Sequence, residues 1–196
     1  MLLFSEYDKS LENIYISQPV VDINLGDTNN YLVRFPKFKR VTHMILAFDA
    51  ENLFLKSKSS YGYFFNLESL LTDLEESENR GYFVVAVTSN SSRQKQYNPY
   101  PRGEQENFAT MHIESILEDH LPQIYGDYDI DVANLKKIVM GASMGGLMSI
   151  KTGILNPSFE NIISLSPAFW FGFPGIVNDL NNSVSYTHLR AHETLT

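Results

Sequence analysis

The stretch Gly141-Ala142-Ser143-Met144-Gly145 has the residue types of a turn that presents a nucleophile. It matches the pattern G-x-S-x-G, in which a serine lies on a sharp turn between a strand and a helix. The residues two before and two after the serine must be small, because strand and helix pass close together there. Amide N–H groups at the start of the helix would favour a negatively charged oxygen beside Ser143. We therefore predict Ser143 as a nucleophile.

Two other interpretations of this stretch have no nucleophile. A glycine-rich turn between a strand and a helix can serve packing alone, and it can also bind an anion through its backbone amides. A phosphate-binding P-loop does not fit, because Leu147 and Met148 follow the glycines where that motif has lysine and then serine or threonine. The surrounding elements favour the nucleophile, since the apolar run 136–140 precedes the motif and the helical pattern 145–157 follows it.

Short apolar strands alternate with amphipathic helices along the rest of the chain, which predicts crossover connections and a mostly parallel sheet flanked by helices. We expect strands in segments 30–36, 44–48, 82–89, 136–140 and 160–170, helices over 65–81, 104–128 and 145–157, and a polar loop over 90–103. Pro122 should kink or end the second helix. Sites on such sheets form where parallel strands end, here at Asp49, Ser89, Ser143 and Ser166.

Composition narrows the classes of function. The 196 residues suffice for one domain, and the net charge of −8 argues against nucleic acid and anionic membranes as partners. The absence of cysteine excludes disulfides, thiolate metal sites and a cysteine nucleophile. The first ten residues resemble neither a signal peptide nor a membrane span, so we expect a cytoplasmic protein. Scattered histidines indicate no metal site, and no cofactor is implied.

Four motifs in order resemble the esterase D-type, or "putative esterase", family of α/β hydrolases. They are FDAENLF at 48–54, RQKQYNPY at 93–100, GASMGG at 141–146 and SLSPAFWFG at 164–172. The resemblance covers roughly residues 30–175 and implies an α/β-hydrolase fold. It also implies a carboxylic-ester hydrolase that works through an acyl-enzyme on a serine.

The resemblance assigns roles to individual residues. Ser143 would be the nucleophile, and the backbone N–H of Met144 one oxyanion donor. The second donor would be the N–H of Glu51, with Ala50 as the alternative; Ala50 stands where the family commonly has glycine. A further set, Asn52, Tyr97 and Trp170, would line or brace a pocket for a small acyl, aryl or sugar ester. Packing alone is the competing role of Tyr97 and Trp170.

The catalytic base of such an enzyme is a histidine. Along the chain, the serine comes first, then the acid, and then this histidine. His43, His112 and His120 precede Ser143, so only His188 and His192 qualify by position. Both lie in the closing stretch VSYTHLRAHETLT. Asp179 lies in the segment after the sixth strand, which is too early in the chain for the catalytic acid. We expect it to be a surface residue.

The closing stretch resembles the translation of a transposase adapter used in short-read sequencing. We therefore expect residues 1–183 to be a partial α/β-hydrolase domain and 184–196 a non-native tail; a natural tail is the alternative. The last strands, the catalytic acid and the histidine would then be missing, and 160–166 would be an unprotected sheet edge. The fragment would have little or no activity. Two other functions stay open: a non-catalytic binding module of this fold, and an acyltransferase.

Overall fold

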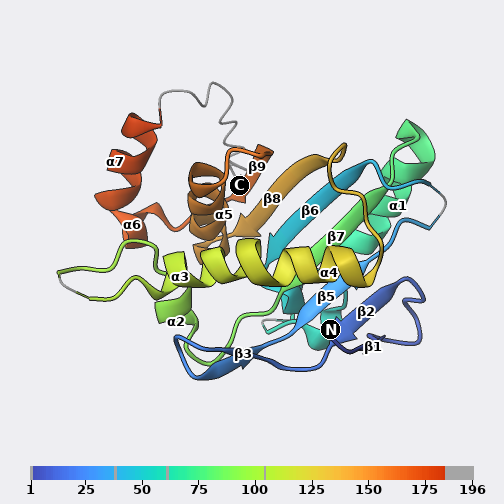
Figure 1. Cartoon of the computed structure of the whole chain (residues 1–196), viewed down its shortest axis with the longest axis horizontal. Coiled ribbons are helices and arrows are strands. Elements are labelled where there is room, and N and C mark those ends of the chain that lie inside the picture. Colours follow the sequence, from blue (N-terminus) through green and yellow to red (C-terminus); the bar gives the residue numbers. More distant parts are fainter. Residues whose placement is uncertain (1, 38, 61, 104, 184–196) are drawn as a thin grey trace.

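The protein is a single layer of sheet with helices on both faces (Figure 1). The computed structural model describes residues 2–183 except 38, 61 and 104. Seven strands form the main sheet in the order β1-β2-β5-β7-β6-β8-β9, and β3 pairs with β4 in a separate two-stranded ribbon. The strands are β1 (Phe4–Glu6), β2 (Ile14–Ser17), β3 (Val20–Asp22), β4 (Asp27–Asn29), β5 (Tyr31–Arg34), β6 (His43–Phe48), β7 (Tyr82–Val87), β8 (Lys136–Ala142) and β9 (Phe159–Leu165).

The helical elements cross between the strands and cover the sheet. They are η1 (Ala50–Asn52), η2 (Lys56–Lys58), α1 (Leu67–Glu78), α2 (Arg93–Gln96), α3 (Phe108–Ser115), η3 (Ile116–His120), α4 (Leu121–Asp127), α5 (Met144–Leu155), α6 (Phe169–Gly172) and α7 (Gly175–Asn182). All three predicted long helices exist. The segment 90–103, predicted as a loop, contains the short helix α2, so that prediction was wrong for Arg93–Gln96.

The strands β7, β6, β8 and β9 run parallel, as the alternation of strands and helices predicts. Their carboxyl ends therefore meet at one edge, which brings Asp49, Ser143 and Ser166 to the same side of the sheet and confirms that expectation. β5 pairs antiparallel with β7, and β2 and β1 continue the antiparallel part. β9 is the last strand of the sheet within the residues the structure describes.

One predicted boundary was wrong, and for Pro122 only one of the two predicted outcomes, the end of the helix, is contradicted. The last strand was expected to reach Trp170 but ends at Leu165, because Ser166 has a positive φ of 42° and turns the chain into α6. Pro122 does not end its helix, which continues to Asp127. The turn before it, η3, is a π-helix, and this wider turn accommodates a ring that would crowd the carbonyl four residues back.

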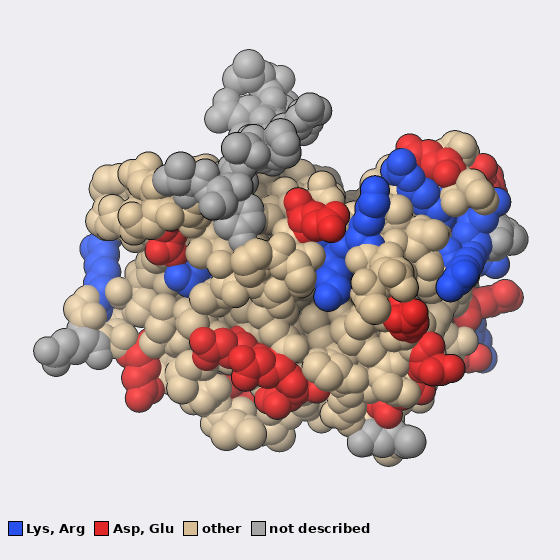
Figure 2. Space-filling model, turned by 45° about the horizontal axis from the view of Figure 1, so that its top comes forward, with Lys and Arg blue, Asp and Glu red and all other residues tan. Residues whose placement is uncertain are grey.

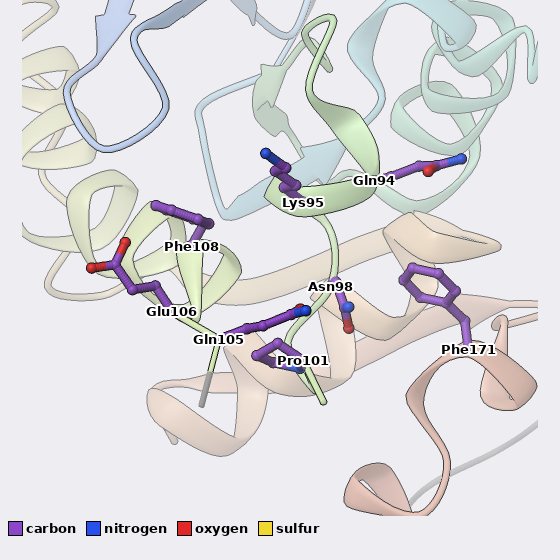
Figure 3. Close-up of a pocket in the computed structure, with 8 residues that line it drawn as sticks. All are labelled: Gln94, Lys95, Asn98, Pro101, Gln105, Glu106, Phe108 and Phe171. Atoms are coloured by element: carbon purple, nitrogen blue, oxygen red, sulfur yellow. The ribbon is translucent and has the colours of Figure 1, made fainter. Parts of the chain in front are cut away.

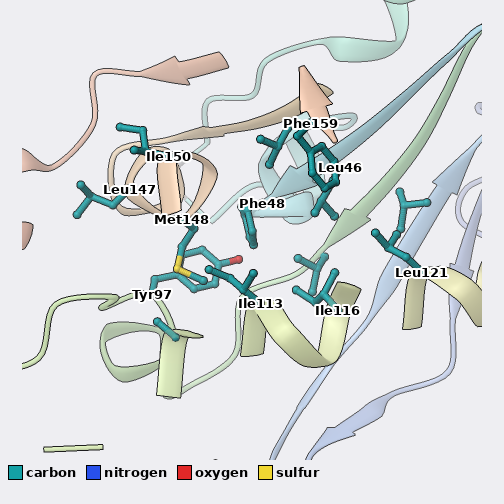
Figure 4. Packing of buried hydrophobic residues seen from close by; sticks show 14 of the residues in the cluster. Leu46, Phe48, Tyr97, Ile113, Ile116, Leu121, Leu147, Met148, Ile150 and Phe159 are labelled. Atoms are coloured by element: carbon teal, nitrogen blue, oxygen red, sulfur yellow. The ribbon is translucent and has the colours of Figure 1, made fainter. Parts of the chain in front are cut away.

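Alternating side chains on the central strands build two cores. Leu46 and Phe48 of β6 face α3, η3, α4 and α5, whereas Ile45 and Ala47 face α1. Figure 4 shows Phe48 among Met148, Tyr97 and Ile113, which come from three different segments. Burial of this apolar surface on both faces holds β6 and β8 in place, and these are the strands that end at Asp49 and Ser143.

A buried ion-pair cluster fixes α1 to the sheet. The guanidinium of Arg34 on β5 is fully buried; its Nε donates to Glu68 at 2.7 Å, and its Nη1 donates to Glu75 and to the Tyr82 carbonyl. Both carboxylates come from α1. Burial by itself would raise the pKa of Glu68, but the hydrogen bond and charge of Arg34 hold that pKa below its usual value.

We predict that Arg34→Met destabilises the protein by about 3–5 kcal/mol, because Glu75 loses its guanidinium partner in the interior and Glu68 keeps only the Lys37 ammonium as an ion-pair partner. Urea denaturation followed by circular dichroism measures the change. Arg80→Met is the matched control: Arg80 pairs with Glu78 at the surface, and its loss should leave the midpoint almost unchanged. Equal midpoints for Arg34→Met and the unmutated protein would contradict the cluster's role.

Candidate active site

Ser143 occupies a sharp turn between β8 and α5. β8 ends at Ala142 and α5 begins at Met144, so the serine is the only residue between strand and helix. Its φ of 54° and ψ of −118° belong to a conformation that residues other than glycine rarely adopt. A serine before a helix ordinarily caps it by accepting an N–H bond, but the Ser143 side chain makes no capping bond and is exposed. Its hydroxyl is therefore not committed to capping α5.

Close contacts leave no room for a side chain at either glycine of the motif. A Cβ at Gly141 would overlap the carbonyl oxygen of Gly145, and a Cβ at Gly145 would lie 2.8 Å from Oδ2 of Asp49. Only glycine fits both positions without displacing the helix or the Asp49 carboxylate. The predicted reason for small residues, close passage of strand and helix, is confirmed at Gly141, whereas Gly145 is required by the approach of Asp49 from the loop after β6.

The main chain of Ser143 is held from outside the turn. Its N–H donates to the carbonyl of Leu165 at 3.0 Å, and its carbonyl accepts the N–H of Ala168 at 3.0 Å. Both partners belong to the end of β9 and the segment after it. Because these bonds fix the peptide groups on each side, the strained turn is supported by the neighbouring strand rather than by α5 alone.

The loop after β6 lies beside this turn and is tied to it by Arg93. Asp49 has a positive φ of 58°. Arg93 on α2 binds both of its carboxylate oxygens, with Nε to Oδ1 at 2.8 Å and Nη2 to Oδ2 at 2.9 Å. The third nitrogen, Nη1, lies 3.4 Å from the sulfur of Met144. Arg93 thus links the Asp49 loop to the first residue of α5.

The sequence reasoning did not identify the role of Arg93. The segment 93–100 was recognised as a motif, but only Tyr97 was taken from it. Asp49 and Arg93 are 44 positions apart in the sequence, so no local pattern reveals that they form a bidentate arginine–carboxylate pair. The available signal was that the motif RQKQYNPY begins with an arginine, Arg93.

Met144 and Glu51 are the predicted oxyanion donors. Met144 opens α5, where unpaired N–H groups and the helix dipole favour negative charge. Glu51 lies in η1 with its carboxylate accepting the hydroxyl of Ser89 at 2.5 Å and the Ser89 N–H at 3.2 Å. Burial raises the pKa of Glu51, although the Ser89 hydroxyl and the backbone N–H of Glu51 itself partly offset that rise.

A cavity of about 240 Å³ opens beside Ser143. Asp49, Arg93 and Asn52 supply polar groups near the serine, and the remaining walls are mostly apolar. Those walls come from Phe48, Leu53, Tyr63, Phe65, Met140, Gly141, Ala142 and Leu165. A small polar end and a larger apolar body are the features of a site for a small organic ligand. Asn52 also accepts the Ser59 hydroxyl and the Ser60 N–H, each at 3.1 Å, which fixes the loop carrying Tyr63.

The structure separates the three residues predicted to line or brace the pocket. Asn52 lines the Ser143 cavity. Tyr97 is fully buried beneath it, and its hydroxyl accepts the Asp49 N–H at 3.3 Å, so it supports the loop from below. Trp170 is 78% exposed and lines a different hollow, beyond α2.

No histidine within residues 2–183, as far as they are described, lines the Ser143 cavity. His112 Nδ1 lies 3.1 Å from Asp22, His120 Nδ1 lies 2.5 Å from the Tyr31 hydroxyl, and His43 Nδ1 contacts Thr42 at 2.8 Å. His188 and His192 lie outside the described residues, as does the predicted tail.

Asp179 is held in a local network on α7. It accepts a hydrogen bond from the Lys151 ammonium at 2.7 Å and one from the Tyr100 hydroxyl at 3.0 Å. Its side chain is 27% exposed, so it lies at the surface as expected, with two partners that the sequence did not predict. These two partners keep its carboxylate on the α5–α7 side of the molecule.

Among the described residues, no group of histidine, aspartate and glutamate side chains is arranged to hold a metal ion. None of the helices in that part of the chain combines the length and apolar character needed to cross a membrane.

Comparison with known families decides the assignment. The family model "Putative esterase" matches residues 25–186, most of the chain. The chain belongs to this esterase family. The match includes all four motifs from which the resemblance was predicted, including the Ser143 turn. A search of curated proteins finds no match for this chain.

Solved structures share the esterase's fold. The siderophore hydrolase EstA from Aspergillus nidulans superposes with a TM-score of 0.67 at 17% identity, covering 92% of this chain and 66% of its own. The BES protein from Bacillus cereus gives 0.69 at 16%, covering 92% and 71%. The enterobactin esterase FES from Shigella flexneri gives 0.60 at 15%, covering 89% and 43%. At these identities the likeness establishes the α/β-hydrolase fold, and this esterase spans about two thirds or less of EstA and FES.

Glu51 should make stability depend on pH in a characteristic direction. Because its pKa is raised on folding, the stability linked to Glu51 is highest below its unfolded pKa and falls as pH rises through the folded pKa. We predict that the free energy of unfolding of Glu51→Gln, relative to the unmutated esterase, increases between about pH 4 and pH 7. Urea denaturation across this range measures it.

Glu68→Gln is the control with the opposite sign. The pKa of Glu68 is lowered, so its contribution is present above its unfolded pKa and is lost as pH falls. The relative stability of Glu68→Gln should therefore decrease as pH rises. A pH dependence of Glu51→Gln identical to that of the unmutated esterase would refute the burial of a charged Glu51.

Proposed function

We propose that Ser143 is the nucleophile of a carboxylic-ester hydrolase. The observation that carries this proposal is the exposed hydroxyl on a strained turn, uncommitted to helix capping and opening onto a largely apolar cavity. A structural serine at the start of a helix has no reason to adopt this conformation, because capping would stabilise it. Membership of the esterase family supports the same chemistry.

The reaction would proceed by acyl transfer to Ser143. Oγ attacks the ester carbonyl while its proton passes to a base, and the carbonyl oxygen becomes an oxyanion beside the N–H groups of Met144 and Glu51. Collapse of this intermediate breaks the bond to the alkoxide, which leaves as an alcohol with the proton. Water then attacks the acyl-enzyme in the same way and releases the acid.

Arg93 would act in this scheme as a positioning residue. Met144 and the Asp49–Glu51 loop come from separate strand ends, and Arg93 contacts both. By fixing one against the other it sets the distance between the two donor N–H groups. Such preorganisation makes an oxyanion hole effective, because the donors need not move as charge develops.

For the substrate we propose a small ester whose acyl or aryl part fills the apolar cavity. Tyr63 and Phe65 are among the exposed aromatic side chains of the described residues, and both line this cavity. EstA is a siderophore hydrolase and FES is an enterobactin esterase, which supports an ester substrate for this protein.

No histidine that could act as the base lines the cavity among the residues that the structure describes. We propose that the printed chain lacks the histidine and acid of this family and has little or no hydrolytic activity. The lack of any histidine at the cavity among the described residues also favours a second candidate, a binding module of this fold without catalysis. Product analysis would separate hydrolysis from acyl transfer, which shares the acyl-enzyme. A cytoplasmic location stays a prediction of the sequence.

The nucleophile is tested by covalent labelling. We predict that a fluorophosphonate probe modifies Ser143 and that Ser143→Ala abolishes the modification, as read by mass spectrometry of peptides. Ser166→Ala is the matched control, because Ser166 is also exposed, has a positive φ and ends a neighbouring strand. Labelling that survives in Ser143→Ala, or that disappears in Ser166→Ala, would contradict the assignment.

The missing base predicts a distinctive pH profile for the same labelling. Without a histidine, the rate should rise by about tenfold per pH unit from pH 6 to 9, because only the small alkoxide fraction reacts. A histidine base would instead produce a plateau above about pH 6.5–7. A plateau that disappears in His188→Ala or His192→Ala would show that the closing stretch supplies the base and would overturn the proposal.

A further inference from the structure

Helix α2 carries Arg93, so whatever holds this helix determines where the guanidinium lies. α2 has only four residues, and the Ser92 side chain makes no capping bond at its start. A single helical turn has little stability of its own, so contacts with the rest of the fold must fix it. Figure 3 shows the exposed side chains of Gln94 and Lys95, which line an open hollow of about 470 Å³. The contacts that hold α2 therefore come from its buried side.

Gln96 is the buried side chain of α2. It is fully buried, and its Nε2 donates to Oδ1 of Asn29 at 2.8 Å. Asn29 is 2% exposed and belongs to β4, in the two-stranded ribbon that lies beside α2 (Figure 1). This hydrogen bond ties α2 to the β3–β4 ribbon.

Asn29 also holds the chain that leads into α2. Its Nδ2 donates to the carbonyl of Thr88, directly after β7, at 2.5 Å. Its Oδ1 accepts a second N–H, from Asn90, at 3.3 Å. One buried amide therefore holds both the start and the end of the segment 88–96. We call the side chains of Asn29 and Gln96, together with the Thr88 carbonyl, the amide clasp.

The amide clasp costs stability that an apolar side chain would not cost. Among the described residues, no group donates a hydrogen bond to Oε1 of Gln96, although this oxygen is buried. A buried polar atom without a partner destabilises a fold, and an apolar side chain of the same length would avoid that loss. The position of α2, rather than stability, is therefore what the Gln96 amide provides.

The amide clasp is built from neutral groups. Figure 2 shows acidic and basic side chains interspersed on one face of the molecule, where water and salt weaken the attraction between them. The amides of Asn29 and Gln96 are instead buried and uncharged. A substitution that removes only the Gln96 amide is therefore sufficient to open the clasp.

We propose that Gln96 and Asn29 are positioning residues for Arg93. Gln96 lies three residues after Arg93 in the same helical turn, so loss of its anchor lets the turn shift and moves the guanidinium. Arg93 then loses the geometry that binds both oxygens of Asp49 and places Met144 beside that loop. The effect on the reaction rests on the proposed function, whereas the effect on Arg93 does not.

Gln96→Met tests the clasp, because it removes the amide and keeps the length and the helix propensity of the side chain. Oδ1 of Asn29 keeps the Asn90 donor, so the variant leaves this oxygen with a partner. Nuclear magnetic resonance measures the exchange of the Arg93 Nε–H with water. This exchange should become about tenfold faster, because the bond to Asp49 is less populated.

The reaction gives the second measurement. Fluorophosphonate labelling of Ser143 should be about tenfold slower in Gln96→Met at every pH, because the oxyanion donors lose their spacing while the ionisation of the serine is unchanged. Gln94→Met is the matched control: it makes the same change on the exposed side of the same helix and should alter neither exchange nor labelling. The Nε–H of Arg34, which donates to Glu68, is an internal reference whose exchange should stay constant.

Unchanged Arg93 exchange in Gln96→Met would overturn the proposal. Faster exchange at Arg93 and Arg34 together would also overturn it, because the fold would then be loosened as a whole. Faster exchange at Arg93 alone with an unchanged labelling rate would refute the positioning role.

Asn29→Leu opens the clasp from the ribbon and should repeat both effects, which keeps the test available if Gln96→Met does not fold. Circular dichroism checks the fold of each variant. A protein in which Arg93 exchange responds but Ser143 is never labelled, even without substitution, would refute the esterase proposal and the effect on the reaction. The control of Arg93 by the clasp would still stand.

Discussion

The contact between β8 and α5 at Gly141 and Gly145 is the constraint on which the rest of the site depends. The strand and the helix approach until a Cβ on either glycine would collide with a neighbouring oxygen. One residue must then reverse the chain, and Ser143 does so at a positive φ. Packing in the two hydrophobic cores holds β8 and α5 in this contact. The free energy that offsets the strain of the turn therefore comes from residues far from the serine.

Polar contacts at the ends of the parallel strands extend this arrangement. The Asp49 carboxylate occupies the space that a side chain on Gly145 would need, and Arg93 holds that carboxylate in place. Tyr97 supports the same loop from the buried side through the Asp49 N–H. The loop, the turn and α2 thus form one unit with fixed spacing. An oxyanion hole needs such rigidity. Hydrogen-bond donors that must first move into place stabilise the negative charge of the transition state less than donors that are already in position.

Much of this arrangement can be predicted from the sequence, and the exceptions share a cause. The central strands, the three long helices and the Ser143 turn have strong local signals in apolar periodicity and glycine spacing. The strands β1 to β4 are only three or four residues long, too short for a pattern, and α2 was hidden in a polar segment. Arg93 with Asp49, Arg34 with Glu75 and the place of Trp170 across α2 from Ser143 depend on contacts between distant segments. No local pattern encodes such contacts.

A crystal structure of the chain phosphonylated by a fluorophosphonate would test the central claim most directly. The account predicts phosphorus bonded to Oγ of Ser143, the positive φ retained, and the phosphoryl oxygen about 2.7–3.1 Å from the backbone nitrogen of Met144. The backbone nitrogen of Glu51 should lie within hydrogen-bond distance of the same oxygen. Ser143 found unmodified, with its hydroxyl turned inward to cap α5, would contradict the account.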